Sequence, residues 1–408
     1  MTPQQLVAQR SPREALQQSA GAAHQPYRHA AIASTALPDD LAREVYCVLG
    51  MPIDAVDVAE VLRRIEAAAA AAMPYLISTP NLNFLTNSRS DLEFRESVLQ
   101  SDLCPADGMP IVWIARIMGL PIRERIAGAD IFEMLKAERR SARPMRVFLF
   151  GGADGIAAAA ANTLNAKPGG LTCVGDLCPG FGSLDDMSQD QIIDTINASD
   201  ADFLAVALGA SKGQAWLRQN HDRLQIPVRS HLGATINFQA GTIKRAPASI
   251  RKLGLEWLWR IKEEPRLWRR YGHDGAVLMR LLLTRVLPLA IAVQWQRLTR
   301  ERNGQDLMIK RSQDNDCVVL SLSGAATAPH VDKAVAWFRD AVTANRPITI
   351  DLAGASAIDA RFLGLFLMLR KQANGQGTRL NFTGVPFYIA RMFRLNGVEF
   401  LLSSDGVA

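Results

Sequence analysis

Between about residues 42 and 241, short apolar runs alternate with longer segments that have the spacing of amphipathic helices. Runs that are apolar at consecutive positions are typical of parallel strands that helices cover on both faces. The apolar runs predict strands at residues 75–79, 102–106, 145–150, 171–175, 202–208 and 228–232. The segments between them predict helices at residues 58–72, 156–164, 189–198 and 212–220. This pattern predicts an α/β fold built on a parallel sheet.

The same alternation resumes on a smaller scale after a polar stretch at residues 301–316. It predicts strands at 318–322, 348–352 and 380–382, helices at 328–343, 362–373 and 387–395, and a closing apolar segment at 398–402. A chain of 408 residues exceeds what one hydrophobic core usually serves. We therefore predict an α/β domain at residues 41–241 and a small α/β domain at 317–405, with 301–316 as a linker.

The segments that flank the first domain differ from it in composition. Residues 1–40 mix Gln, Ala, Ser, Pro and His without an apolar run, which is typical of a disordered tail and not of a signal peptide. The whole chain has a net charge of +6, and residues 242–300 are especially rich in basic side chains. A basic block indicates phosphates, anionic lipids or nucleic acid as partners, although a solvated helix face has the same composition. Nucleic acid is disfavoured, because Trp257, Trp259 and Trp268 lie among apolar helical positions and are predicted to pack.

The most apolar stretch of the chain, residues 276–295, lies inside this basic segment. Arg280, Arg285 and Pro288 interrupt it. Because each arginine at the centre of a spanning helix costs roughly 3 kcal/mol, an amphipathic helix in the membrane interface is the favoured interpretation. Residues 242–300 are thus predicted to associate with an anionic membrane surface.

Polar residues and glycines follow the predicted strands where the strands end. Ligands of parallel α/β sheets bind at the carboxyl ends of the strands. These clusters therefore predict one ligand site at this edge of the sheet. Its candidate residues are Thr79, Asn81, Asp107, Gly151, Gly152, Gly209, Lys212, Gln214 and Gly233.

Two of these clusters indicate specific chemistry. The Gly151-Gly152 turn lies between a strand and a helix, where backbone amides and the helix dipole can hold a phosphate, unless it is only a structural turn. It fits neither the dinucleotide-binding GxGxxG pattern nor the GxxxxGK[ST] loop. Asp107 precedes a predicted helix, so it either caps that helix or acts as a general base toward an attacking hydroxyl.

Cysteines and histidines narrow the class of protein. The five cysteines are scattered without a CxxC pair, which disfavours a disulfide framework or a zinc knuckle and favours a reducing cytoplasm. The six histidines have no ligand spacing with acidic residues, so no metal site is predicted. The absence of a GxSxG motif disfavours acyl transfer.

Several short motifs between about residues 45 and 270 form a set that is specific in combination. They are Thr79-Pro80-Asn81, Ala106-Asp107-Gly108, Arg125-Ile126-Ala127-Gly128-Ala129-Asp130, Gly151-Gly152, Gly209 with Lys212 and Gln214, Gly233, residues 241–247 and Gly254-Leu255-Glu256-Trp257. This set resembles the WecG/TagA/CpsF glycosyltransferases, glycosyltransferase family 26.

The resemblance implies a Rossmann-like domain of the type E glycosyltransferase fold and an inverting, metal-independent enzyme without a cofactor. It implies a UDP-sugar donor and a polyprenyl-diphosphate-linked saccharide acceptor, used in bacterial exopolysaccharide or cell-surface glycan synthesis at the cytoplasmic face of the cell membrane. Asp107 would be the base, with Thr79 and Asn81 beside it. The donor and its diphosphate would bind Arg125, Gly151, Gly152, Gly209, Lys212, Gln214 and Gly233. The lipid diphosphate of the acceptor would bind Lys244, Arg245, Arg260, Arg266, Arg269 and Arg270.

Two segments depart from the pattern of this family. Ser211-Lys212-Gly213-Gln214 stands where the family commonly has Pro-Lys-Gln-Glu. Asn237 precedes Phe238 where an acidic residue is frequent. These changes concern the donor sugar more than the reaction type. They motivate one alternative, a non-enzymatic regulator that binds nucleotide or lipid, which the retention of Asp107 disfavours.

The small domain at residues 317–405 is similar to STAS domains. Its matching segments are residues 348–352, 357–365, 377–384 and 395–401. In that family a Ser or Thr commonly follows the aspartate and is phosphorylated, whereas here Ala360 follows Asp359. Without a hydroxyl the phosphorylation switch cannot operate. Docking to a protein partner is the leading hypothesis for this domain, ahead of dimerisation, ligand sensing or a passive structural role.

Overall fold

The computed structural model describes residues 39–140, 142–167, 169–252, 254–300, 306–314 and 316–403. Except for Asp39 and Asp40, the predicted disordered tail lies outside the described residues, as do residues 301–305 of the predicted linker.

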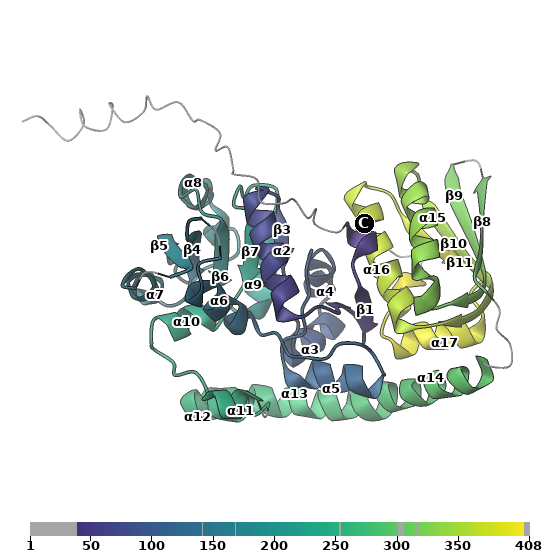
Figure 1. Cartoon of the computed structure of the whole chain (residues 1–408), viewed down its shortest axis with the longest axis horizontal. Coiled ribbons are helices and arrows are strands. Elements are labelled where there is room, and N and C mark those ends of the chain that lie inside the picture. Colours follow the sequence, from purple (N-terminus) through teal and green to yellow (C-terminus); the bar gives the residue numbers. More distant parts are fainter. Residues whose placement is uncertain are drawn as a thin grey trace, which may run out of the picture. The chain divides into compact units, whose positions relative to one another are not determined.

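A five-stranded parallel sheet forms the first domain (Figure 1). Alternate side chains of each central strand enter different cores: Phe203 of β6 lies in one core and Leu204 in the other. Both faces are therefore apolar, which explains the continuous apolar runs in the sequence. This confirms the predicted Rossmann-like α/β fold. The strand order is β3 (Tyr75–Ile77), β7 (Val228–His231), β6 (Phe203–Ala207), β4 (Met145–Gly151) and β5 (Leu171–Leu177).

Helices cover both faces of this sheet (Figure 1). One core contains side chains of α2 (Val58–Ala70), α6 (Gly128–Ala137), α7 (Ile156–Asn165) and α10 (Thr235–Gln239). The other core contains side chains of α8 (Asp190–Ala198) and α9 (Ala210–Gln219). The helices α7 and α9 begin at the carboxyl edge of the sheet, because each follows a strand directly.

The predicted strand at 102–106 was wrong. Only a single bridge joins Leu103 to Ile77 of β3. Side-chain carboxylates add to the few backbone bonds of this segment: Asp102 accepts the backbone N–H of Leu76 at 2.8 Å, and Asp54 accepts that of Cys104 at 2.6 Å. An apolar run does not reveal that side chains make part of the hydrogen bonds of a segment.

The sequence pattern also missed an N-terminal hairpin, β1 (Val45–Val48) and β2 (Met51–Asp54). Its two turn residues, Leu49 and Gly50, both have positive φ, as a type I′ turn requires. The helices α3 (Leu82–Ser90), α4 (Leu92–Leu99) and α5 (Met109–Ile117) complete this part of the fold.

The C-terminal domain, which we define as the described residues from 306 to 403, contains a second sheet of order β11-β10-β9-β8. β8 (Met308–Asp314) lies inside the predicted linker 301–316, so that prediction was wrong there. As an edge strand it is mostly polar and therefore resembles a linker in sequence. The other strands are β9 (Cys317–Ala326), β10 (Ile348–Ile358) and β11 (Leu380–Thr383), and the helices are α15 (Val331–Thr343), α16 (Ala360–Gly375) and α17 (Phe387–Leu395).

A helical segment connects the two sheets: α11 (Ala248–Lys252), α12 (Glu256–Glu263), α13 (Trp268–Leu281), the π-helical turn η4 (Leu282–Val286) and α14 (Leu287–Arg300). The last three are continuous and extend well beyond the predicted 276–295 (Figure 1). In the part of the chain that the structure describes, Pro265–Gln294 is the helix whose length and composition would suffice to cross a membrane.

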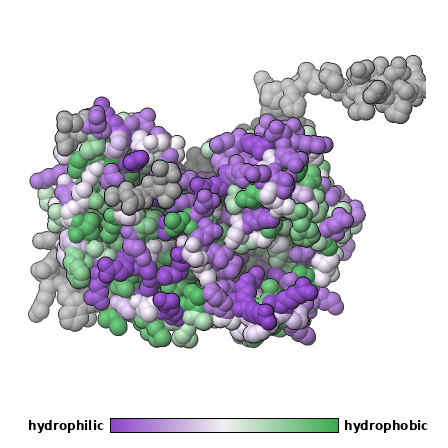
Figure 2. Space-filling model, turned by 180° about the vertical axis from the view of Figure 1, so that it is seen from behind, coloured by the Kyte–Doolittle hydropathy of each residue, from purple (hydrophilic) through white to green (hydrophobic). Residues whose placement is uncertain are grey.

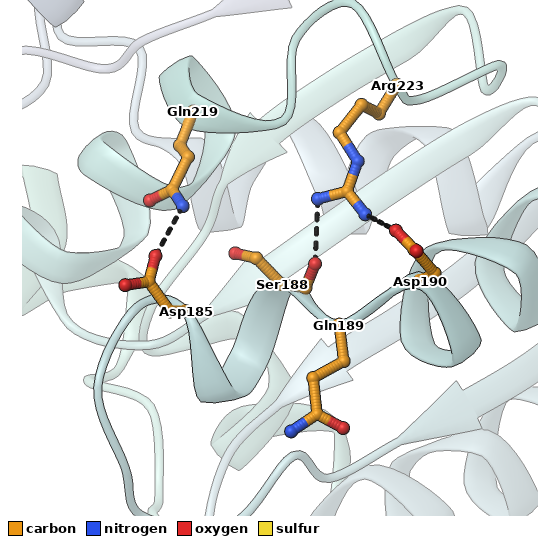
Figure 3. Close-up of a pocket in the computed structure, with 6 residues that line it drawn as sticks. All are labelled: Asp185, Ser188, Gln189, Asp190, Gln219 and Arg223. Atoms are coloured by element: carbon orange, nitrogen blue, oxygen red, sulfur yellow. Dashed lines mark hydrogen bonds and ion pairs between the residues drawn. The ribbon is translucent and has the colours of Figure 1, made fainter.

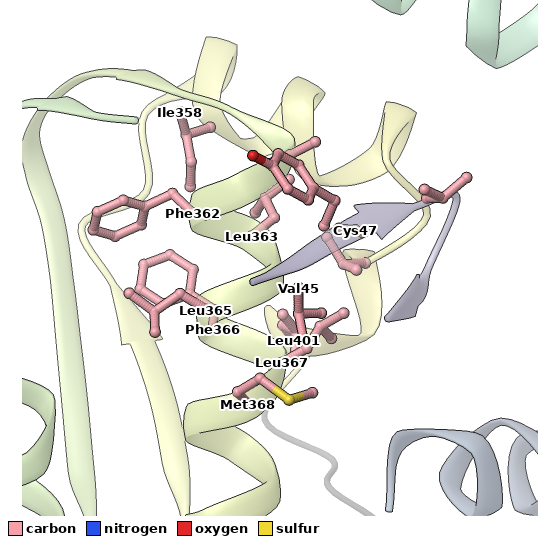
Figure 4. Close-up of a cluster of buried hydrophobic side chains, with 14 of the residues drawn as sticks. Val45, Cys47, Ile358, Phe362, Leu363, Leu365, Phe366, Leu367, Met368 and Leu401 are labelled. Atoms are coloured by element: carbon pink, nitrogen blue, oxygen red, sulfur yellow. The ribbon is translucent and has the colours of Figure 1, made fainter. Parts of the chain in front are cut away.

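One hydrophobic core is shared by the N-terminal hairpin, α4, α5 and the C-terminal domain. Figure 4 shows Val45 and Cys47 of β1 facing Leu363 and Leu367 of α16. A Cβ on Gly364 of α16 would lie 2.1 Å from the carbonyl oxygen of Val45, so only glycine permits this close approach. The described residues from 39 to 403 accordingly belong to one compact unit.

Candidate functional site

Asp107 lies at the carboxyl edge of the parallel sheet, beside the end of β3. Its backbone N–H donates to the carbonyl of Pro80 at 2.8 Å, which holds the two strand-end segments together. The following residue, Gly108, is the N-cap of α5 and has a φ of 110°. Because no side chain caps that helix end, Asp107 is not a helix cap, and its carboxylate is left for another role.

The pKa of Asp107 is raised from its ordinary value to about 7, chiefly because its carboxylate is surrounded by protein atoms. The guanidinium of Arg125 and the N–H of Gly128 oppose this shift, whereas the charges of Glu256 and Asp130 add to it. A carboxylate with a pKa near neutrality is suited to general base catalysis.

Thr79 and Asn81 lie next to Asp107. Thr79 is buried, and a Cβ on Gly128 would lie 3.4 Å from its Oγ1. Asn81 is the N-cap of α3, where its Oδ1 accepts the N–H of Phe84 at 3.1 Å. Its Cβ is 3.6 Å from the place a Cβ on Gly108 would take. The three residues predicted to be catalytic are thus brought together.

The predicted phosphate-binding glycines line the neighbouring strand ends. Gly151 and Gly152 have φ values of 103° and 85°, and a Cβ on Gly151 would lie 2.6 Å from the carbonyl oxygen of Ala207. Gly209, with a φ of 83°, is the N-cap of α9. Free backbone amides at the starts of α7 and α9 therefore point toward this edge, an arrangement that binds phosphate oxygens.

Lys212 and Gln214 have contacts that differ from those of ligand-binding side chains. Exposed Lys212 donates to the carbonyl of Gly182 at 2.8 Å, which ties down the loop after β5. Gln214 is buried and donates to Ser78 Oγ at 2.8 Å. Its Oε1 has no hydrogen-bond partner among the described residues. Among the polar side-chain atoms of Lys212 and Gln214, Gln214 Oε1 is therefore the candidate for a contact with the sugar donor.

His231 was not predicted as a site residue. It ends β7, is 7% exposed, and its Nε2 has no partner among the described residues. Cβ atoms on Gly213 and Gly233 would lie 2.2 and 3.1 Å from its ring, so both glycines leave space for it. Burial lowers its pKa to about 4, so the imidazole is neutral near pH 7 and can donate or accept a hydrogen bond. A histidine at the carboxyl end of a predicted strand, two residues before Gly233, was the signal that could have identified it.

Arg125 lies in a cluster of ion pairs that sequence reasoning missed. It pairs with Asp130 at 2.7 Å and with Glu256 at 2.8 Å. Asp130 also pairs with Arg245 at 2.5 Å and Arg251 at 2.8 Å. These contacts join the start of the basic segment to the residues around Asp107. Arg125 and Arg245 are therefore held by carboxylates and near the site.

The remaining cations predicted to bind the acceptor lie before α11 (Lys244), in α12 (Arg260), in the 3₁₀ turn Pro265–Leu267 (Arg266) and in α13 (Arg269 and Arg270). Arg260 pairs with Glu264 at 2.5 Å. Lys244, Arg266, Arg269 and Arg270 are exposed. The prediction that the tryptophans pack was wrong for two of them, since Trp257 is 41% exposed and Trp268 60%. They lie on the outer face of their helices.

An apolar stripe continues along the connecting helix. Every fourth side chain is exposed, which places these side chains on one face. They are Met279 at 57%, Leu283 at 59%, Leu287 at 44% and Ile291 at 69%. Figure 2 shows hydrophobic residues at the lower edge of the molecule, the side on which α14 lies in Figure 1.

A separate surface hollow lies at the far end of α9, between that helix and α8 (Figure 3). Its polar groups bind one another: Gln219 donates to Asp185 at 2.9 Å, and Arg223 donates to Asp190 at 2.5 Å and to the carbonyl of Ser188 at 2.7 Å. Within the described ranges there is no group of His, Cys, Asp or Glu side chains that could hold a metal ion.

Comparison with known proteins gives two family matches. Residues 46–290 match the glycosyl transferase WecG/TagA/CpsF family. Residues 309–403 match the Mlab, STAS domain family, which confirms the predicted resemblance of the C-terminal domain.

Among curated relatives, the chain is similar to N-acetylglucosaminyldiphosphoundecaprenol N-acetyl-beta-D-mannosaminyltransferases. The protein from Bacillus spizizenii is 30% identical over 176 residues, which is 43% of this chain and 66% of the relative, just under two thirds of its length. The protein from Staphylococcus aureus strain MW2 is 24% identical over 229 residues, covering 55% of this chain and 86% of the relative.

Proposed function

Because this chain belongs to the WecG/TagA/CpsF family of glycosyl transferases, we propose that it moves a sugar from a UDP-sugar to a saccharide carried on polyprenyl diphosphate, with inversion at the anomeric carbon. The observation that carries the proposal is Asp107, a carboxylate with a pKa of about 7 that lies among Thr79, Asn81 and Arg125. The names of the relatives support an acceptor of the diphosphoundecaprenol-sugar class.

In the proposed mechanism Asp107 takes the proton of an acceptor hydroxyl, whose oxygen attacks the anomeric carbon as the bond to UDP breaks. The charge that develops on the diphosphate is stabilised by the free backbone amides at the starts of α7 and α9. Arg125 lies near enough to Asp107 to influence its pKa, so its guanidinium can also stabilise the charge on the diphosphate. His231 Nε2 and Gln214 Oε1 are available for polar groups of the donor.

The rate should depend on pH through Asp107. Since only the ionised carboxylate accepts a proton, kcat/KM should rise about tenfold per pH unit below the pKa and level off above it. With the pKa at about 7, the bend is expected there and not near the ordinary value of 3.8. Glu256→Gln removes a charge that raises this pKa, so its bend should move to lower pH. A rate that does not change across this range in the wild type would contradict the assignment.

We also propose that the protein is peripheral at the inner face of the cell membrane. The exposed stripe from Met279 to Ile291 supports apolar insertion, and the exposed Arg266, Arg269 and Arg270 support attraction to anionic lipid. The opposite face of the same helix is occupied, because Arg285 donates to the carbonyl of Arg394 at 2.7 Å and to Glu399 at 3.0 Å. A spanning helix would break these contacts, so an interfacial position is favoured.

Replacing Leu283 and Ile291 together by Asp should lower binding to anionic vesicles at least about tenfold, because each buried apolar side chain contributes about 1.5–3 kcal/mol. Flotation with phosphatidylglycerol-containing vesicles measures this. Met73→Asp is the matched control, since Met73 is 49% exposed but lies outside the stripe. A wild type that does not bind these vesicles would exclude the proposed location.

A further inference from the structure

Backbone and side-chain hydrogen bonds together hold the segment at residues 101–106, which leads to Asp107. On one side the N–H of Asp102 donates to the carbonyl of Leu76 in β3 at 2.7 Å, and on the other the N–H of Asp54 at the end of β2 donates to the carbonyl of Cys104 at 3.0 Å. The carboxylate of Asp54 accepts the N–H of Cys104 at 2.6 Å, three residues before Asp107. The carboxylate of Asp102 accepts the N–H of Leu76 at 2.8 Å. These two carboxylates therefore add side-chain bonds to the backbone bonds that position the segment.

Two cations hold those carboxylates. Arg43, which is 2% exposed, binds Asp54 through Nε at 3.2 Å and Nη2 at 2.8 Å. Lys371 binds Asp102 at 2.5 Å. Both cations also donate to the carbonyl of Ser101, at 2.9 and 3.3 Å, and both pair with Asp40 at 2.9 Å. A buried bidentate arginine pair is directional, so it defines a position as well as neutralising charge.

Lys371 belongs to α16 of the C-terminal domain, and α16 is itself fixed against the first domain along its length. Arg361 donates to the carbonyl of Val45 at 3.2 Å near the start of the helix. Arg370 pairs with Glu96 of α4 at 2.7 Å near its end. Between them α16 packs on β1, as Figure 4 shows. The helix therefore holds Lys371 in a defined position beside Ser101.

The same network reaches the other side of the site. Ser101 Oγ is 2.7 Å from the Oγ of Ser78, the residue before Thr79. The N–H of Asp107 binds the carbonyl of Pro80 at 2.8 Å. The two segments that carry Asp107, Thr79 and Asn81 are thus joined to each other, and both are joined to α16 through Ser101.

We propose that the C-terminal domain is a positioning element of the transfer site, in which Lys371 and Arg43 hold the segment from Ser101 to Cys104 and so set the place of Asp107. This inference rests on the proposed function for its effect on the rate, but not for its effect on the segment. Lys371 is a positioning residue and does not touch substrate.

Lys371→Met in the full-length protein tests the proposal, with Lys371→Arg as the conservative variant. Arg311→Met is the matched control, because Arg311 also forms an ion pair, with Asp340, but entirely within the C-terminal domain. Amide hydrogen exchange of the peptide that spans 101–108 should become faster in Lys371→Met and remain unchanged in the control. Small misplacement of a catalytic group costs up to about 100-fold in rate, so kcat should fall about tenfold or more with the donor KM within about twofold. Lys371→Arg should keep most of the wild-type kcat and most of the slow amide exchange at 101–108.

Unchanged exchange at 101–108 in Lys371→Met would overturn the proposal, as would faster exchange with an unchanged kcat. An equal loss of kcat in Arg311→Met would overturn it too, since that result indicates general loosening of the domain. A wild type that transfers no sugar would contradict the proposed function instead, and the exchange result alone would then decide whether α16 holds this segment.

Discussion

Asp107→Asn is expected to lower acceptor-dependent UDP release by about 100-fold or more, the contribution that general base catalysis typically makes. The amide has the shape of the carboxylate but cannot take the proton of the acceptor hydroxyl. Purified protein would be offered a panel of UDP-sugars with a short-chain polyprenyl-diphosphate saccharide, and UDP would be measured with and without the acceptor. The donor that supports release identifies the sugar, which the fold does not specify.

A measurement of UDP affinity distinguishes a variant that has lost the catalytic step from one whose binding site is disrupted. UDP affinity should stay within a few-fold in Asp107→Asn, because the proposed diphosphate contacts are backbone amides and Arg125. Asp222→Asn, at an exposed position away from this edge, is the matched control and should keep the wild-type rate. If the wild type binds UDP-sugars and releases no UDP with any of them, the regulator becomes the better interpretation.

Gly364→Ala is expected to destabilise the protein by about 1–3 kcal/mol, as overpacking of a tight core usually does. The direction of this change in stability is informative, because replacing Gly by Ala inside a helix ordinarily stabilises the protein by roughly 0.5–1 kcal/mol. Here the added Cβ would lie 2.1 Å from the Val45 carbonyl oxygen, and neither backbone can move without separating α16 from β1. Thermal unfolding should record a fall in Tm of a few degrees, because a chain of 408 residues shifts by less per kcal/mol than the about 2–4 °C of a domain of roughly 150–250 residues.

Gly375→Ala provides the control in the same helix. No atom lies within 4 Å of the place a Cβ would take there. Its Tm should be unchanged or slightly higher than that of the wild type. Equal Tm values for the two variants would show that the close contact between α16 and β1 does not contribute to stability.

The sequence alone determined the layered α/β fold and the edge at which the candidate residues gather. The run at β6 is apolar at every position, and that at β4 is apolar from Val147 to Phe150, because both faces of the sheet are covered, and this property is local to each strand. Since parallel strands share one carboxyl edge, the residues after β3, β4, β6 and β7 had to meet there. Thr79, Asn81 and the glycines of the turns could be found for this reason, whereas Asp107 was found after the predicted strand at 102–106, of which the structure forms a single bridge.

Only the tertiary structure decided which side chains neutralise or hold one another. The ion pairs of Arg125 with Asp130 and Glu256, and the hold of Lys371 on Asp102, join residues from 5 to 269 positions apart. The same holds for the 101–106 segment, where the carboxylate of Asp54 adds a bond to those of the backbone, and for His231, whose space depends on Gly213. Charged side chains are long and have many rotamers, so their partners follow from the packing of the backbone and leave no periodic pattern in the sequence.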